Sequence, residues 1–102
     1  MSDGVLITIE MVIKPELAEQ VCAGIPQMFE DTVKFKGFRS IRVVKHEDEP
    51  NRVLIVEHWD SKDDYQAYQD WRNKDGQMEA AYANLLSFKA EYWPTPVGYK
   101  AV

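Results

Sequence analysis

Four segments of the sequence place apolar residues at every second position, and helical patterns lie between them. Successive side chains of a strand point to opposite faces of a sheet, so this period predicts β-strands. The strands are expected at residues 5–13, 38–45, 52–59 and 88–93. The short polar segment 46–51 joins the second strand to the third and predicts a hairpin.

The first helical pattern begins at Pro15, where proline is favourable because its missing N–H would have no helical partner. Apolar residues spaced three and four apart then predict an amphipathic helix that ends at Lys36 and Gly37. This apolar stripe consists of Leu17, Val21, Ile25, Met28, Phe29 and Val33. A proline inside a helix removes a hydrogen bond, so we expect a kink or a break near Gly24, just before Pro26.

The second helical pattern begins after Ser61, which together with Asp64 resembles a capping box. It is expected to end near residues 73–76. A further helical stretch follows, and its apolar residues are Met78, Ala81, Tyr82, Leu85 and Leu86. Residues 94–102 show no periodicity and are predicted to form a C-terminal tail.

The resulting order, β-α-β-β-α-(α)-β, is that of an α+β ferredoxin-like fold in one domain spanning residues 1–102. It predicts a four-strand antiparallel sheet with the helices on one face. The strands at 5–13 and 52–59 carry apolar residues on both faces. Because an exposed apolar sheet face is uncommon in monomers, we expect a homodimer that packs through this face.

Composition excludes several classes of protein. The 102 residues include 12 Lys and Arg against 17 Asp and Glu, a net charge of −5 that disfavours nucleic-acid binding. The single cysteine, Cys22, excludes an internal disulfide framework and a cysteine-based zinc site. The sequence has no glycine-rich phosphate loop, no cationic start typical of a signal peptide and no apolar run of about 18 residues. A cytoplasmic protein without metal ligands or membrane contact is therefore expected.

Two adjacent residues are candidates for a general base. Glu57 shares a strand face with Trp59, and a carboxylate buried there needs a basic partner or acts as a perturbed acid or base. His58 points to the opposite face, where it acts either as a proton carrier or as a hydrogen-bonded sheet histidine.

Aromatic residues gather in the second half of the chain: Trp59, Tyr65, Tyr68, Trp71, Tyr82, Tyr92 and Trp93. They are suited to lining a cavity for a flat apolar ligand, with phenol groups to orient it. They are equally suited to packing in the core and at the subunit interface, and the sequence leaves both interpretations open.

Three segments resemble the antibiotic biosynthesis monooxygenase superfamily. They are Ile13-Lys14-Pro15, Lys36-Gly37-Phe38 and, most specifically, residues 56–62 with the sequence Val-Glu-His-Trp-Asp-Ser-Lys. The similarity extends over about residues 5–93. It implies a dimeric α+β barrel, formed by two ferredoxin-like subunits packed sheet to sheet.

The resemblance also implies site residues. Quinone-forming oxygenases of the family use a tryptophan and a tyrosine, which Trp59 and Tyr65 match. Their asparagine and arginine correspond to Ile55 and approximately Glu79. The haem-degrading branch has an asparagine, a tryptophan and a histidine at the positions of Thr8, Tyr68 and roughly Met78, so its pattern does not fit.

The leading hypothesis is a cofactor-independent monooxygenase that acts on a small phenol or quinol. Trp59 and Tyr65 would be catalytic, with Glu57 or His58 as the base, and Tyr68, Trp71 and Tyr82 would bind the substrate. One alternative is a dimeric small-ligand-binding or stress-response module without enzymatic activity. Another is an isomerase or dehydratase, for which an acid–base pair facing one closed cavity would argue.

Overall fold

The computed structural model describes residues 3–101, without the side chains of Asp75 and Gln77. The strands are β1 (Val5–Ile13), β2 (Phe38–Lys45), β3 (Arg52–Trp59) and β4 (Leu85–Trp93). The α-helices are α1 (Ala18–Thr32), α2 (Lys62–Asn73) and α3 (Gln77–Tyr82). Short 3₁₀ helices at Pro15–Leu17 and Lys74–Gly76 precede α1 and α3.

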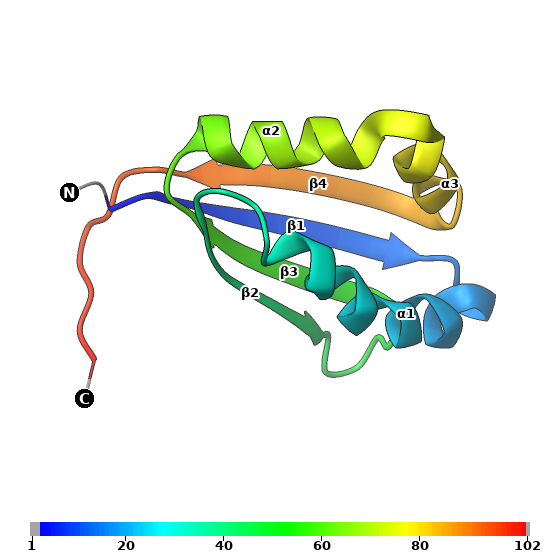
Figure 1. Cartoon of the computed structure of the whole chain (residues 1–102). Helices are drawn as coiled ribbons and strands as arrows, with labels where there is room; N and C mark the ends of the chain where they lie inside the picture. Colours follow the sequence, from blue (N-terminus) through cyan, green and yellow to red (C-terminus); the bar gives the residue numbers. More distant parts are fainter. Residues whose placement is uncertain (1–2, 102) are drawn as a thin grey trace.

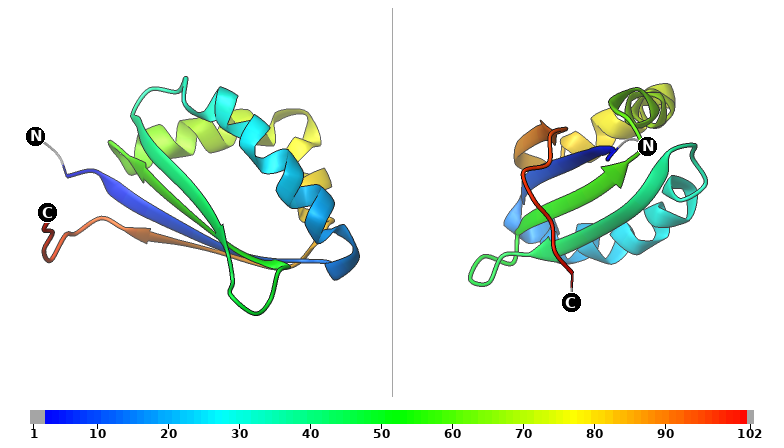
Figure 2. Two further views of the ribbon diagram at one scale, coloured as in Figure 1. Left: turned by 90° about the horizontal axis from the view of Figure 1, so that it is seen from below. Right: turned by 90° about the vertical axis from the view of Figure 1, so that its left-hand side faces the viewer.

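The four strands form one antiparallel sheet in the order β2-β3-β1-β4. All three α-helices cover the same face of this sheet (Figures 1 and 2). The predicted α+β ferredoxin-like fold is therefore confirmed. The central pair, β1 and β3, is in register from Val5 opposite Trp59 to Val12 opposite Arg52.

The strand period decides which side chains enter the core. Odd-numbered residues of β1 and β3 face the helices, and the buried ones are Val5, Ile7, Ile9, Ile13, Val53, Glu57 and Trp59. The even-numbered residues face away from the helices and are exposed or half-buried. Removing apolar surface from water contributes about 25 cal/mol per Å², so this parity sets the orientation of the sheet.

The side chain of Trp59 lies at the centre of the main core cluster and is fully buried. Its ring stacks on Tyr68 with centroids 5.1 Å apart and meets Tyr65 edge-on at 5.8 Å. Phe38 contacts it edge-on from β2 at 5.5 Å. Much of the aromatic clustering in the sequence is thus core packing between α2 and the sheet.

The first helix differs from its prediction at two points. It continues through Gly24 and Pro26 as one 15-residue helix, so of the expected kink or break, the break is wrong. Packing of the apolar stripe against the sheet outweighs the one hydrogen bond that Pro26 cannot donate. At its end, Thr32 is buried whereas Val33 is exposed, because the hydroxyl of Thr32 has hydrogen-bonding partners in the interior.

The predicted boundary between the last helix and the last strand is also wrong. Leu85 and Leu86 belong to β4, and α3 ends at Tyr82. The register of β4 shifts between Val12 and Ile13 of β1, so Leu85 pairs with Ile13 while Ser87 pairs with Val12. A short apolar pair fits both helical and strand patterns, and this bulge turns the side chain of Leu85 toward the helices.

The predicted cap at the start of α2 is confirmed. The Ser61 side chain accepts a hydrogen bond from the Asp64 backbone N–H at 3.1 Å and caps α2. Residues 94–101 extend beyond β4 without helix or strand (Figure 1). In the described part of the chain, no helix combines the length and apolar character needed to cross a membrane.

The loop that joins α1 to β2 passes very close to the start of α2. Gly37 has φ of 86°, and its carbonyl accepts a hydrogen bond from the Asp60 N–H at 2.7 Å. A Cβ at Gly37 would overlap the side chain of Asp64. Glycine is therefore required here for both its backbone conformation and its small size.

We expect Gly37→Ala to lower the free energy of unfolding by at least about 1–2 kcal/mol, because alanine is strained at positive φ. Gly24→Ala is the matched control: a Cβ at Gly24 has no neighbour within 4 Å, and alanine favours helix by about 1 kcal/mol. Urea denaturation of both variants measures the difference. Equal stabilities would contradict the tight approach of the loop to α2.

Candidate active site

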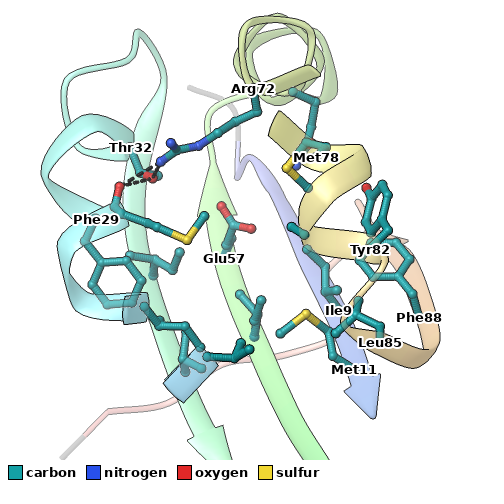
Figure 3. Close-up of a pocket in the computed structure, with 18 of the residues that line it drawn as sticks. Ile9, Met11, Phe29, Thr32, Glu57, Arg72, Met78, Tyr82, Leu85 and Phe88 are labelled. Atoms are coloured by element: carbon teal, nitrogen blue, oxygen red, sulfur yellow. Dashed lines mark hydrogen bonds between the residues drawn. The ribbon is translucent and has the colours of Figure 1, made fainter. Parts of the chain in front are cut away.

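A cavity of about 150 Å³ lies between the helices and the covered face of the sheet (Figure 3). Its wall is mostly apolar and comes from all three α-helices and all four strands. Every methionine after Met1, namely Met11, Met28 and Met78, lines it. The polar side chains of the wall are Thr32, Glu57, Tyr68, Gln69, Arg72 and Tyr82.

Glu57 enters the cavity from β3 and is only 3% exposed. Its Oε1 accepts a hydrogen bond from Trp59 Nε1 at 3.1 Å, which the two side chains reach because residues two apart share a strand face. No described side chain binds Oε2. Figure 3 shows the carboxylate pointing toward the end of the cavity where Arg72 and Thr32 lie.

Burial raises the pKa of Glu57, because removal from water disfavours the charged carboxylate. The hydrogen bond from Trp59 and the positive charge of Arg72 act in the opposite direction without cancelling the effect of burial. Of the two alternatives for a buried Glu57, a basic partner or a perturbed acid or base, the structure shows a carboxyl group of raised pKa on which Arg72 acts through space. Among the described residues, no ion pair joins the two side chains within 4.0 Å.

Arg72 reaches the cavity from α2 and is 7% exposed. Its Nε donates to the Tyr68 hydroxyl at 2.9 Å. Its Nη2 donates to the Met28 carbonyl at 2.7 Å and to Thr32 Oγ1 at 3.1 Å. Nη1 has no partner among the described residues. The guanidinium is thus held on two sides and leaves one nitrogen free.

The hydroxyl groups that hold Arg72 form an ordered chain of hydrogen bonds. Thr32 Oγ1 donates to the Met28 carbonyl at 3.1 Å, since a carbonyl only accepts. The Tyr68 hydroxyl, 2.9 Å from Thr32 Oγ1, must then donate to it. Tyr68 therefore lines the cavity with its ring, while its hydroxyl proton is already engaged.

The structure does not bring the predicted catalytic pair directly into the cavity. Trp59 lies behind Glu57 and reaches the cavity only through the hydrogen bond to that carboxylate. Tyr65 is buried, and its hydroxyl accepts a hydrogen bond from Gln69 Nε2 at 2.6 Å. Burial, followed by the charge of Glu57, raises the pKa of Tyr65 strongly, so its phenol stays protonated.

The other predicted residues divide between the cavity and the surface. Tyr82 lines the cavity from α3, with its ring 5.0 Å from that of Phe88, and burial raises its pKa. Trp71 lies outside, where its ring packs 5.1 Å from Phe35. His58 is on the opposite face of the sheet, where its Nε2 donates to the Asp3 carbonyl at 2.9 Å.

Of the two base candidates, only Glu57 therefore faces the cavity. A carboxylate in an apolar site can accept a proton from a ligand, and a nearby guanidinium can stabilise the anion that remains. Within residues 3–101, no group of three or more His, Cys, Asp and Glu residues is placed to hold a metal ion.

Sequence reasoning did not single out Arg72 and Thr32. The spacing of Tyr65, Tyr68 and Arg72 on α2 was the available signal for the arginine, because residues three and seven apart share a helix face. A buried carboxylate at Glu57 needs a nearby cation, which was a second indication of a basic residue in the site. Thr32 had no comparable signal. At its end the apolar stripe of the first helix continues at helical spacing to Val33 as well as to Thr32, and the apolar residue is the expected choice for the buried position.

Residues 4–82 match a family model described as antibiotic biosynthesis monooxygenase. No curated protein matches the sequence.

Several solved structures share the fold. A candidate antibiotic biosynthesis monooxygenase from Deinococcus radiodurans superposes with a TM-score of 0.77 at 18% identity, covering 96% of this chain and 98% of that one. Its counterpart from Nitrosomonas europaea gives a TM-score of 0.78 at 11% identity, covering 95% and 94%. A conserved protein from Methanosarcina mazei gives 0.75 at 14% identity, covering 91% and 93%. At these identities the likeness concerns the fold alone.

The raised pKa of Glu57 predicts how stability depends on pH. The folded protein holds this proton more tightly than the unfolded chain, so the contribution is fully present below the unfolded pKa, near 4.5. It is lost as the pH rises through the higher folded pKa. Glu57→Gln keeps an oxygen for Trp59 Nε1 and carries no charge, so it should not lose this stability.

We therefore expect Glu57→Gln to have a higher Tm than the wild type at pH 8 and little advantage at pH 4. Thermal unfolding followed by circular dichroism across this range measures the difference. Glu30→Gln, which neutralises an exposed carboxylate on α1, should follow the wild-type curve. A wild type and Glu57→Gln that respond identically to pH would contradict a costly buried charge.

Proposed function

The chain belongs to the antibiotic biosynthesis monooxygenase family, and from this premise we propose that it oxygenates a small phenol or quinol in the cavity. Glu57 takes the proton of the substrate hydroxyl, and the resulting anion reduces O₂. For a phenol with a free ring C–H opposite the hydroxyl, one oxygen atom of O₂ enters the ring. The other leaves as water, and a quinone forms. The substrate supplies all the electrons, so the proposal requires no cofactor.

The observation that carries this proposal is the free oxygen of Glu57 in a cavity with an apolar wall. A base of raised pKa shares a proton with a phenol more evenly than an exposed carboxylate does. The burial of Arg72 strengthens the attraction between its guanidinium and a developing oxyanion.

Arg72 supplies a guanidinium, although it is not at the position that matches the arginine of the family's quinone-forming oxygenases. That position, near Glu79, is exposed on α3, whereas Arg72 enters the cavity from α2. Ile55, at the position of the family asparagine, forms part of the apolar wall. In this proposal Trp59 positions Glu57, and Tyr82 contacts the substrate.

A second candidate is an acid–base enzyme, an isomerase or dehydratase that needs no O₂. The presence of Glu57 and Arg72 in the wall of one cavity favours it, because both reactions begin with proton removal beside a cation. A binding module would use the same cavity without turnover. The three functions differ in what happens after the ligand is bound.

We expect the wild type to consume O₂ with at least one member of a panel of single-ring phenols, hydroquinones and dihydroxynaphthalenes. Glu57→Gln should lower kcat by about 100-fold or more, since it removes the base. An oxygen electrode measures the rate, and Glu30→Gln is the control. No O₂ uptake across the panel would contradict the oxygenase.

Two further readouts separate the alternatives on the same samples. Exchange of a ligand C–H for deuterium from solvent, without O₂ uptake and dependent on Glu57, supports an acid–base enzyme. Ligand binding without either reaction supports a binding module.

We also propose that the open face of the sheet packs against a second copy of the chain. Its apolar side chains are Leu6, Val12, Val44, Leu54, Val56 and Trp93. Trp93 is 52% exposed, yet its Nε1 donates to Thr8 Oγ1 at 2.9 Å, which fixes the ring against this face. The pairs Arg52–Glu10 and Lys89–Glu91 neutralise four charges of the face within the subunit, which reduces repulsion by an identical face.

Sedimentation at micromolar concentration should give the mass of a dimer. Val56→Lys, at the centre of the open face opposite Thr8 and Arg42, should give a single subunit, because each interface would bury two added ammonium groups, each beside an Arg42 of like charge. Gln20→Lys, on the exposed side of α1, is the control with the same charge change. A monomeric wild type would contradict the proposal.

A further inference from the structure

Residues 94–101, which we call the arm, continue from the end of β4 and leave the sheet. Figures 1 and 2 show the arm beyond the strand ends and away from all three α-helices. Within the described residues, no hydrogen bond, ion pair or aromatic contact joins the arm to another segment. Its backbone and side chains are therefore open to contact with a second molecule.

Two prolines keep the first part of the arm extended. Pro94 has no N–H for a further bond of the sheet, and β4 ends directly before it at Trp93. A proline ring fixes its own φ and restricts the preceding residue to extended conformations. Pro94 and Pro96 therefore stiffen residues 93–96, which lowers the conformational entropy that is lost when the arm docks on a partner.

The arm exposes two apolar side chains almost completely. Val97 is fully exposed and Tyr99 is 92% exposed, more than any other large apolar side chain in the described part of the chain. Because successive side chains of an extended segment alternate, Val97 and Tyr99 share one face when the arm lies extended, and Lys100 lies on the other. An apolar face of this kind, with a tyrosine in it, is typical of a segment that another protein surface covers.

The arm begins at the open face of the sheet. Trp93, directly before it, belongs to this face, where its Nε1 donates to Thr8 Oγ1 at 2.9 Å. Two sheets that pack face to face lie about 10 Å apart. At about 3.1 Å per extended residue, the stretch from Trp93 to Val97 spans about 12 Å, so the arm is long enough to cross from one sheet to the other.

We propose that the arm crosses to a second copy of the chain and packs Val97 and Tyr99 on the sheet of that copy. A second copy is the occupant because a chain that covers the open face also lies beside the start of the arm at Trp93. A two-fold axis makes the exchange reciprocal, so each subunit donates one arm and receives one. This inference rests on the proposed dimer and adds the segment that fastens its subunits together.

Chymotrypsin, which cleaves after exposed aromatic residues, tests whether the arm is covered at Tyr99. We expect cleavage after Tyr99 to be at least about tenfold slower in the wild type than in Val56→Lys, because the arm must leave its partner before it enters the protease. Gln20→Lys should be protected like the wild type. Mass spectrometry of the chain follows the loss of the residues after Tyr99. A dimeric wild type cleaved as fast as Val56→Lys would overturn the inference.

The contribution of the apolar face is tested by replacing Val97 and Tyr99 together with serine. Both positions lie outside the core, so the subunit should fold unchanged. We expect the dissociation constant of the dimer to rise at least about tenfold, because buried tyrosines contribute strongly to interfaces. Lys100→Ser, on the opposite face of the arm, is the matched control. Sedimentation over a range of concentrations measures all three chains, and equal dissociation constants would overturn the inference.

Dimers assembled from isotope-labelled and unlabelled chains show which sheet the arm contacts. We expect nuclear Overhauser effects between the Tyr99 ring of labelled chains and apolar side chains of unlabelled chains. If the Tyr99 ring contacts only its own chain, the arm folds back on its own subunit and the inference is overturned.

The dimer and the arm exchange can fail separately. A dimeric wild type with a freely cleaved arm would contradict the exchange and leave the packing of the open faces standing. A monomeric wild type would contradict both. None of these measurements involves O₂, so their results do not depend on the oxygenase activity.

Discussion

The hydrogen bond from Trp59 to Glu57 connects the apolar core to the cavity. Without it, the carboxylate would be a buried polar group with no protein partner, which costs several kcal/mol. Trp59 can make this bond because its own position is determined by stacking on Tyr68 and by edge contacts with Phe38 and Tyr65. The direction of one carboxylate therefore depends on the packing of an entire aromatic cluster.

The same aromatic packing determines where Arg72 lies. Tyr68 stacks on Trp59 through its ring and binds Arg72 Nε through its hydroxyl. Arg72 lies one turn further along α2 and extends to the end of α1. There the Thr32 hydroxyl and the Met28 carbonyl accept hydrogen bonds from its Nη2. The network joins two helices and the sheet, so the cavity and the fold are stabilised by the same contacts.

The fold was predictable because its signals are local. Period-two strands, the Ser61 cap and the order of elements are each readable from short windows of sequence. Leu85 was misplaced because a pair of leucines fits a helix as well as a strand, and only the shifted register opposite Ile13 decides between them. The candidate site was less predictable, because Arg72 and Thr32 meet only after α1 and α2 pack together. Glu57 was identified because burial of its strand face could be inferred from its neighbours.

The polar part of the cavity wall is a cost to the folded state. Glu57 and Arg72 are both buried, no ion pair within 4.0 Å joins them among the described residues, and burial of a charge costs several kcal/mol. Small domains are stable by only about 5–15 kcal/mol in total. A chain that keeps a carboxyl group and a guanidinium in the otherwise apolar wall of one cavity gives up stability at this place, and a ligand that binds both groups restores it.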